Sequence, residues 1–304
     1  MTGHRLPGLT LPVMVAPMFL VSGVDLVVAA CRAGMVGALP AHNCRTADEL
    51  DRWLGAIAAA LRPGIDAPWA VNLVTHASNS RLPADLAVLH RHRPPIVITA
   101  LGSPKPVIEA VHAYGGIVLA DVVNMTLAAK AVAAGVDGLV CVSAGAGGHT
   151  GFLSPFAFIA AARSLTDGIL CVGGGIGDGA GVAGAIAAGA DLALLGTRFI
   201  AAAESLAVPA YKDMVVTSGI DDLVVSAAIT GTPASWLKPS LLANGYDPAD
   251  LNRPVTRDYG GDPAKRWKDL WAAGQGVGGI HAVEPVAEIA VGLRRGYDAA
   301  AGRL

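Results

Sequence analysis

The residues best suited to chemistry are a histidine and several glycines in the middle of the chain. His149 lies in the segment Gly147-Gly148-His149-Thr150-Gly151, and an imidazole can accept or donate a proton near pH 7. Residues 173–179 and 196–199 form two more glycine-containing segments, and each follows an apolar run. Glycine lets backbone N–H groups approach phosphate oxygens closely, so these two segments predict a phosphate-binding site.

Two other kinds of site compete with this interpretation. Gly175-x-Gly177-x-x-Ala180 matches the glycine pattern of a dinucleotide-binding turn, but no acid ends the next apolar run, as such a turn requires. A metal ion could be bound by the side chains of His42, His76, Asp121 and His149, which would make the protein a metal-dependent hydrolase. The chain has no HExxH motif, so no metal ligand is predicted and the hydrolase stays an alternative.

Eight short apolar runs have the length of β-strands and must position these groups. Their starts are 21 to 34 residues apart, which leaves room for a helix between successive parallel strands. Glycines such as Gly34 and Gly135 stand where the preceding helix would end. The expected strands cover residues 13–18, 35–39, 69–74, 96–99, 117–121, 139–142, 169–173 and 192–195. Eight such units predict an α/β fold, the TIM (β/α)8 barrel, whose reactive groups gather at the C-terminal ends of the strands.

The pattern changes after the eighth expected strand. Residues 205–275 contain three of the five Trp residues and read as a small helical appendage over the C-terminal mouth of the barrel, where they would cover a substrate. The barrel itself is expected to comprise residues 1–204 and 276–304, with a last amphipathic helix near the C-terminus.

The composition excludes several classes of protein. Hydrophobic residues make up 53% of the 304 residues and charged residues 15%, which excludes a disordered chain. The net charge of −2 lacks the basic field of a nucleic-acid-binding protein. Prolines and glycines interrupt the charge-free runs, so we expect no membrane span and a cytoplasmic protein. The four cysteines show no CxxC spacing and are expected to be buried thiols.

Seven short segments form a recognisable series in chain order between about residue 10 and residue 280. The segments are Ala16-Pro17-Met18, Ala33-Gly34-Met35-Val36-Gly37, Val71-Asn72-Leu73, Ala146-Gly147-Gly148-His149-Thr150-Gly151, Gly174-Gly175-Ile176, Gly196-Thr197-Arg198-Phe199, and Trp271 with Gly274-Gln275-Gly276-Val277-Gly278. This series resembles the nitronate monooxygenase (2-nitropropane dioxygenase) family, whose members are FMN-dependent TIM barrels. FMN-dependent enoyl reductases of the FabK type share nearly the same segments.

The resemblance implies an oxidoreductase that binds FMN non-covalently at the barrel mouth and oxidises nitronates or nitroalkanes with O2. His149 matches the catalytic histidine that removes a proton from a neutral nitroalkane. The residues expected to contact FMN are Ala16, Pro17, Met18 and Asn72 around the flavin, Gly147 and Gly148 beside the ring, Gly174, Gly175, Gly196 and Thr197 at the phosphate, and Gln275 near the phosphate.

Two positions depart from the family pattern. Asp121 stands where relatives often carry a lysine, and Gly145 stands where they often carry an acid. An acid in place of a base would change the electrostatic field that tunes a flavin. The sequence therefore leaves a related physiological substrate open, with an enoyl or acyl-thioester reductase or dehydrogenase as the alternative function. It also leaves open whether NAD(P)H is the redox partner and whether the chain forms a homo-oligomer.

Overall fold

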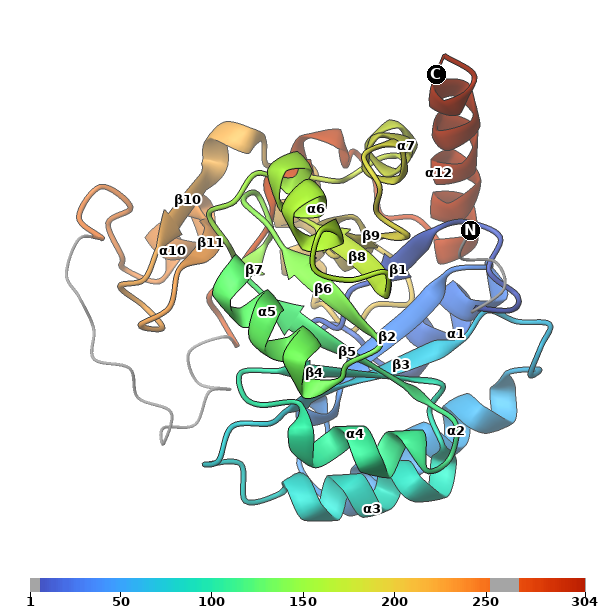
Figure 1. The fold of residues 1–304 in the computed structure, drawn as a ribbon. Coiled ribbons are helices and arrows are strands. Elements are labelled where there is room, and N and C mark those ends of the chain that lie inside the picture. The colour runs from blue at the N-terminus through green and yellow to red at the C-terminus, as the bar shows by residue number, and fades with distance from the viewer. Residues whose placement is uncertain (1–5, 252–267, 304) are drawn as a thin grey trace.

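Eight parallel strands form a closed barrel in the computed structural model, which describes residues 6–251 and 268–303 (Figure 1). The strands follow one another around the barrel in the order β1-β2-β3-β4-β5-β6-β8-β9, and β9 closes the ring by pairing with β1. Their bounds are β1 (Val13–Val15), β2 (Val36–Pro40), β3 (Trp69–Val74), β4 (Ile96–Ala100), β5 (Ile117–Val122), β6 (Gly138–Val142), β8 (Ile169–Gly173) and β9 (Leu192–Leu195). The predicted TIM barrel is confirmed.

Helices surround the barrel and connect the strands. Their bounds are α1 (Val24–Arg32), α2 (Ala47–Ala60), α3 (Leu82–His92), α4 (Lys105–His112), α5 (Met125–Ala134), α6 (Pro155–Arg163), α7 (Gly179–Ala187) and α12 (Val286–Ala301). Polar side chains cap several of the helix starts, as when Asp178 accepts a hydrogen bond from Gly181 N–H at 2.7 Å. Gly135 ends α5 with a φ of 94°, the left-handed conformation that the sequence pattern predicts at this position.

The barrel interior is a packed apolar core with a polar C-terminal rim. Leu119 and Ala70 are buried inside the barrel, in the same cluster as residues from the other strands. Side chains alternate between the two faces of a strand, so Asp121 and Asn72, two residues further along β5 and β3, also face inward. Both therefore lie toward the end of the barrel where the chemistry of this fold takes place.

The segment after β9 contains strands as well as the predicted helices. It comprises α8 (Thr197–Ile200), α9 (Pro209–Thr217), η3 (Ile220–Asp222), β10 (Leu223–Ser226), β11 (Ala234–Leu237), α10 (Lys238–Ala243) and η4 (Gln275–Gly279). Strands β10 and β11 form an antiparallel sheet with β7 (Gly148–His149), which comes from the loop after β6 (Figure 1). The sequence did not predict this sheet, because its strands are only two to four residues long. Part of the predicted appendage, residues 252–267, lies outside the described residues.

The last helix returns to the barrel wall. Helix α12 packs against α7 and α1, the helices on either side of the β9-β1 closure, and its buried side chains are Val286, Ile289 and Leu293. In Figure 1 it stands beside α7 as the red helix. Among the described residues, no helix is long and apolar enough to cross a membrane.

Candidate active site

The predicted site residues all stand at or beyond the C-terminal half of a barrel strand. Ala16, Pro17 and Met18 follow β1, Asn72 lies in β3, Gly147 precedes β7, Gly148 and His149 form β7, Gly174 and Gly175 follow β8, Gly196 and Thr197 begin α8, and Gln275 begins η4. Contacts between these segments decide which of them form one site.

Gly145 joins the loops after β6 and β8 to the segment that leads into η4. Its carbonyl oxygen accepts hydrogen bonds from the N–H groups of Gly175 at 3.0 Å and Gln275 at 2.9 Å. A Cβ atom at position 145 would lie 2.7 Å from Gln275 Oε1, and φ is 85°. The left-handed φ favours glycine here, which gives a local reason for the departure from the family pattern at this position.

A second junction connects Gly147, Gly274 and Thr197. The N–H of Gly274 donates a hydrogen bond to Thr197 Oγ1 at 2.8 Å. A Cβ atom on Gly147 would lie 2.6 Å from Gly274 N, so the two backbones pack directly against each other. The sequence interpretation gave Gly147 the task of leaving space beside a flavin ring. The structure shows that it also permits this close backbone packing.

The glycines of the predicted phosphate site differ in what surrounds them. A Cβ atom on Gly174 would lie 2.5 Å from the carbonyl oxygen of Ala144, and φ is 139°, so this position needs glycine for folding. Gly175 faces open space, since the nearest atom to its Cβ position is Gln275 Oε1 at 3.8 Å. A Cβ atom on Gly196 would lie 3.4 Å from Ala16 Cβ and 3.5 Å from Met18 Sδ. The loops after β1 and β9 therefore meet at Gly196.

Two buried polar atoms beside these segments have no hydrogen-bond partner among the described residues, namely Ser143 Oγ and Arg198 Nη1. Ser143 directly follows β6, and its Cβ lies 3.0 Å from the Cβ position of Gly174. Arg198 follows Gly196 by two residues, and its other nitrogen, Nη2, pairs with Glu284. A buried donor without an acceptor is costly, so an anionic ligand with several oxygens, such as a phosphate ester, fits these atoms.

The sequence did not indicate that the Ser143 hydroxyl would be buried without a hydrogen-bond partner. Only its position directly after an apolar run pointed to the barrel mouth.

His149 is held by the small sheet of the appendage. Its backbone pairs with Ala234 of β11, while the adjacent Thr150 N–H donates to the carbonyl oxygen of Pro233 at 3.1 Å. His149 is exposed to solvent, yet enough protein surrounds the ring for desolvation to lower its pKa below the usual value of 6.5. A lowered pKa keeps the imidazole neutral at pH 7, the form that can accept a proton.

Asp121 is an inward-facing carboxyl group with apolar neighbours. In the register of the barrel it stands beside Val140 of β6, and Ala120, the residue before it, pairs with Thr99 of β4. Its carboxyl group makes no hydrogen bond or ion pair within residues 6–251 and 268–303. Burial raises the pKa of Asp121 to about 7. At neutral pH the carboxyl group therefore carries a proton in part of the molecules.

The structure gives no support to a metal site. In the part of the chain that the structure describes, no three His, Cys, Asp or Glu side chains stand close enough together to hold a metal ion. In particular, His42, His76, Asp121 and His149 do not form such a group.

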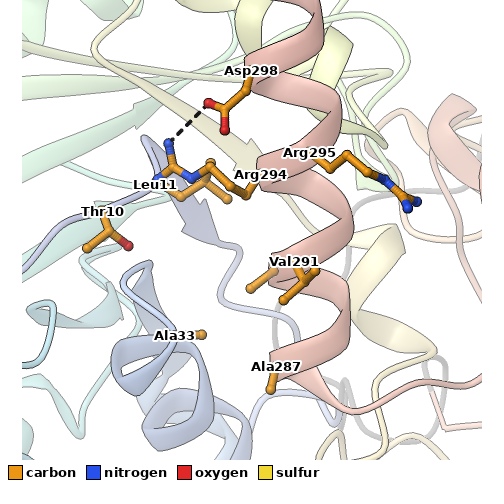
Figure 2. Close-up of a pocket in the computed structure, with 9 residues that line it drawn as sticks. Thr10, Leu11, Ala33, Ala287, Val291, Arg294, Arg295 and Asp298 are labelled. Atoms are coloured by element: carbon orange, nitrogen blue, oxygen red, sulfur yellow. Dashed lines mark ion pairs between the residues drawn. The ribbon is translucent and has the colours of Figure 1, made fainter.

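A pocket of about 650 Å³ lies away from the mouth, between the chain entering β1 and helix α12. Thr10, Leu11 and Ala33 line it on one side and Val291 and Arg294 on the other (Figure 2). It contains none of the predicted site residues, and it adjoins the N-terminal end of β1 rather than the end where barrel enzymes act.

Comparison with known proteins identifies the family of this chain. The profile of the nitronate monooxygenase family matches residues 79–289. A nitronate monooxygenase of Paraburkholderia phytofirmans is 32% identical in an alignment that covers 85% of this chain and 84% of that protein. The (3aS,4S,5R,7aS)-5-hydroxy-7a-methyl-1-oxo-octahydro-1H-indene-4-carboxyl-CoA dehydrogenase of Rhodococcus jostii is 28% identical over 78% of this chain and 65% of its own length.

Among solved structures, the nitroalkane oxidase of Streptomyces ansochromogenes superimposes with a TM-score of 0.80 at 25% identity, covering 97% of this chain and 98% of that one. The family profile spans more than half of the chain, and the first relative is similar over most of its length. This chain is therefore an oxidoreductase that belongs to the nitronate monooxygenase family.

Proposed function

We propose that the protein is an FMN-dependent oxidoreductase that oxidises nitronates or nitroalkanes, or a chemically related substrate, with O2. The observation that carries the proposal is the junction at Gly145, which brings the loops after β6 and β8 together with Gln275. Ser143, which contacts the Gly174 position, and Arg198, two residues after Gly196, each leave a buried donor for an anionic ligand. Family membership supports the same activity.

In this proposal the phosphate of FMN rests on Gly174, Gly175, Gly196 and Thr197, near Gln275, with Ser143 and Arg198 as additional donors. Ala16, Pro17, Met18 and Asn72 line the flavin, with Gly147 and Gly148 on the opposite side. Bound FMN would supply the two-electron redox chemistry of the reaction. Residues 205–275 are proposed to cover the substrate above the barrel, which comprises residues 1–204 and 276–304.

His149 is proposed to act as the general base. The neutral imidazole favoured by its lowered pKa accepts the proton on the carbon next to the nitro group of a neutral nitroalkane. A nitronate has already lost this proton, so it needs His149 only for orientation. The pairing of β7 with β11 fixes the backbone of this base to the appendage, which supports a role at the boundary between barrel and cover.

A second candidate is a dehydrogenase or reductase of an acyl or enoyl thioester. The Rhodococcus jostii relative, by its name a carboxyl-CoA dehydrogenase, favours this candidate. Asp121 supports it as well, because a protonated carboxyl group can donate a hydrogen bond to a carbonyl oxygen. In this candidate the redox partner is NAD(P)H or another electron carrier instead of O2.

Anaerobic mixing of the purified holoprotein with a nitronate, and separately with NADH and NADPH, tests both candidates. Bleaching of the flavin absorbance by the nitronate alone, followed by recovery on admitting O2, supports the nitronate monooxygenase activity. Bleaching by NADH or NADPH alone supports the reductase. Denaturation of the same preparation should release FMN and not FAD, and a protein that binds neither flavin would contradict both candidates.

A further inference from the structure

The side chain of Asn43 binds the loop that follows β1 through three hydrogen bonds. Asn43 belongs to η2 (Ala41–Asn43), the turn after β2. Its Oδ1 accepts a hydrogen bond from Leu20 N–H at 2.8 Å, and its Nδ2 donates to the carbonyl oxygens of Met18 at 3.1 Å and Ser22 at 2.7 Å. One amide group thus uses its donors and its acceptor on a single five-residue loop.

Ser22 closes the same loop from the inside. Its buried hydroxyl accepts a hydrogen bond from Met18 N–H at 2.9 Å and donates to the carbonyl oxygen of Ala16 at 3.1 Å. Ala16, Pro17 and Met18 are therefore held at both ends. This is the segment that meets Gly196 at the start of α8.

Leu20 shows why the loop needs external support. It has a φ of 60°, a left-handed conformation that a residue with a branched side chain adopts only at a cost. In this conformation its N–H donates a hydrogen bond to Asn43. Without Asn43, the loop would lose the interaction that offsets this cost.

Asn43 is itself held in place by a buried ion pair. The guanidinium group of Arg81 donates hydrogen bonds to the carbonyl oxygens of Ala41 and Cys44, which lie on either side of Asn43 in the chain. The same guanidinium donates from Nε to Asp85 Oδ2 at 3.0 Å, and the side chain of Asp85 is fully buried. A chain of polar contacts thus runs from helix α3 through the turn after β2 to the loop after β1.

We propose that Asn43 is a positioning residue that fixes Ala16, Pro17 and Met18 in the conformation needed to line the cofactor. The inference rests on the proposed function, because the cofactor is FMN in that proposal. Asn43 touches the loop backbone and need not touch the ligand. Loss of the Asn43 side chain should therefore make the segment from Ala16 to Met18 more mobile while the barrel remains folded. None of the three hydrogen bonds of Asn43 joins barrel strands.

The variant Asn43→Ala removes all three hydrogen bonds. Asn124→Ala is the control, since it makes the same substitution in another loop that follows a barrel strand, where Asn124 Oδ1 accepts a hydrogen bond from Leu127 N–H at 2.9 Å at the start of α5. If Asn43→Ala does not fold, Arg81→Lys provides a milder test. A lysine keeps the charge beside Asp85 but lacks the planar fork that bridges Ala41 and Cys44.

Three measurements on the full chain are compared: the FMN dissociation constant, the visible circular dichroism of bound flavin, and hydrogen exchange at the amides of residues 18–22. Asn43→Ala should weaken FMN binding at least about tenfold, change the dichroism bands and accelerate exchange. Arg81→Lys should change the FMN dissociation constant, the dichroism and the exchange rates in the same direction as Asn43→Ala, but by a smaller amount. Asn124→Ala should leave FMN binding within about twofold of wild type.

Faster exchange in Asn43→Ala together with wild-type FMN affinity and dichroism would overturn the inference, because Asn43 would then support only the loop. Unchanged exchange would overturn it as well. Failure of the wild-type chain to bind FMN is a different result. It would remove the proposed function and with it the cofactor that Asn43 is proposed to serve.

Discussion

Thr197 accepts a hydrogen bond from the N–H of Gly274 across 2.8 Å, although 77 residues separate them in the chain. Thr197 begins α8 directly after the last barrel strand, while Gly274 lies where the chain returns from the appendage. Gln275, the next residue, binds the carbonyl oxygen of Gly145. The returning chain is thus attached to the loop after β9, which belongs to the predicted phosphate site, and to the loop after β6, whose Gly145 carbonyl oxygen also binds Gly175 of that site. Cofactor binding and placement of the appendage should therefore depend on each other.

Replacing Thr197 tests this dependence. Thr197→Val keeps the shape of the side chain but leaves the Gly274 N–H without its acceptor, which should cost about 1–3 kcal/mol of folding stability and weaken FMN binding. Thr197→Ser retains the hydroxyl and should behave like wild type in both respects. Urea unfolding and FMN titration measure the two effects, and equal behaviour of Val and Ser would show that the hydrogen bond has no such role.

Gly196→Ala and Gly174→Ala should distinguish a position that leaves space for the ligand from a position that needs glycine for folding. At Gly196 the added methyl group makes ordinary contacts with Ala16 and Met18, and φ is −105°, so the cofactor-free protein should keep its stability while FMN binding weakens. At Gly174 the methyl group would meet the Ala144 carbonyl oxygen in a backbone conformation with a φ of 139°, so the fold itself should lose a few kcal/mol. Thermal unfolding without FMN, followed by FMN titration, distinguishes them. Normal FMN affinity in Gly196→Ala would show that the phosphate does not bind at Gly196.

The barrel could be predicted from the sequence because its signals are local. Each strand is a short apolar run, and a glycine such as Gly135 marks the end of the preceding helix. The expected spans 69–74, 169–173 and 192–195 coincide with β3, β8 and β9. The first strand was predicted to reach residue 18 but ends at Val15, because Ser22 and Asn43 hold the following residues in a turn.

The candidate site was only partly predictable, because its contacts are non-local. Sequence motifs pointed to Gly174, Gly196 and Gln275 one by one. Nothing in the local sequence shows that the Gly145 carbonyl oxygen joins two loops or that the Ser143 hydroxyl lacks a partner. The small sheet was missed for the same reason, since its residues pair across segments whose spacing carries no periodic signal.

Asp121 should make stability depend on pH. Its folded-state pKa of about 7 lies above the usual value of 3.8, so between these pH values the folded protein holds a proton that the unfolded chain has released. Stability is therefore lost as pH rises from about 4 to 7 and stays low above that range. Asp121→Asn removes the ionisation and should raise the free energy of unfolding of the cofactor-free protein by roughly 2–4 kcal/mol at pH 8, with little change at pH 4.5.

Urea unfolding at the two pH values measures this effect. Asp213→Asn is a suitable control because it removes one carboxylate from an exposed position. A gain in stability at pH 4.5 as large as that at pH 8 would show that Asp121 does not titrate between those values.

His149 can be tested by comparing a substrate that needs a base with one that does not. A neutral nitroalkane must lose a proton before oxidation, whereas a nitronate has lost it already. General-base catalysis contributes about 10²- to 10⁴-fold, so His149→Ala should lose roughly that factor in kcat/KM with nitroalkanes and far less with nitronates, while FMN binding is retained. Desolvation lowers the pKa of His149, so wild-type activity on nitroalkanes should persist to a pH below 6.5 before protonation of the base abolishes it. Equal losses on both substrates would assign His149 to binding, and no loss on either would remove it from the mechanism.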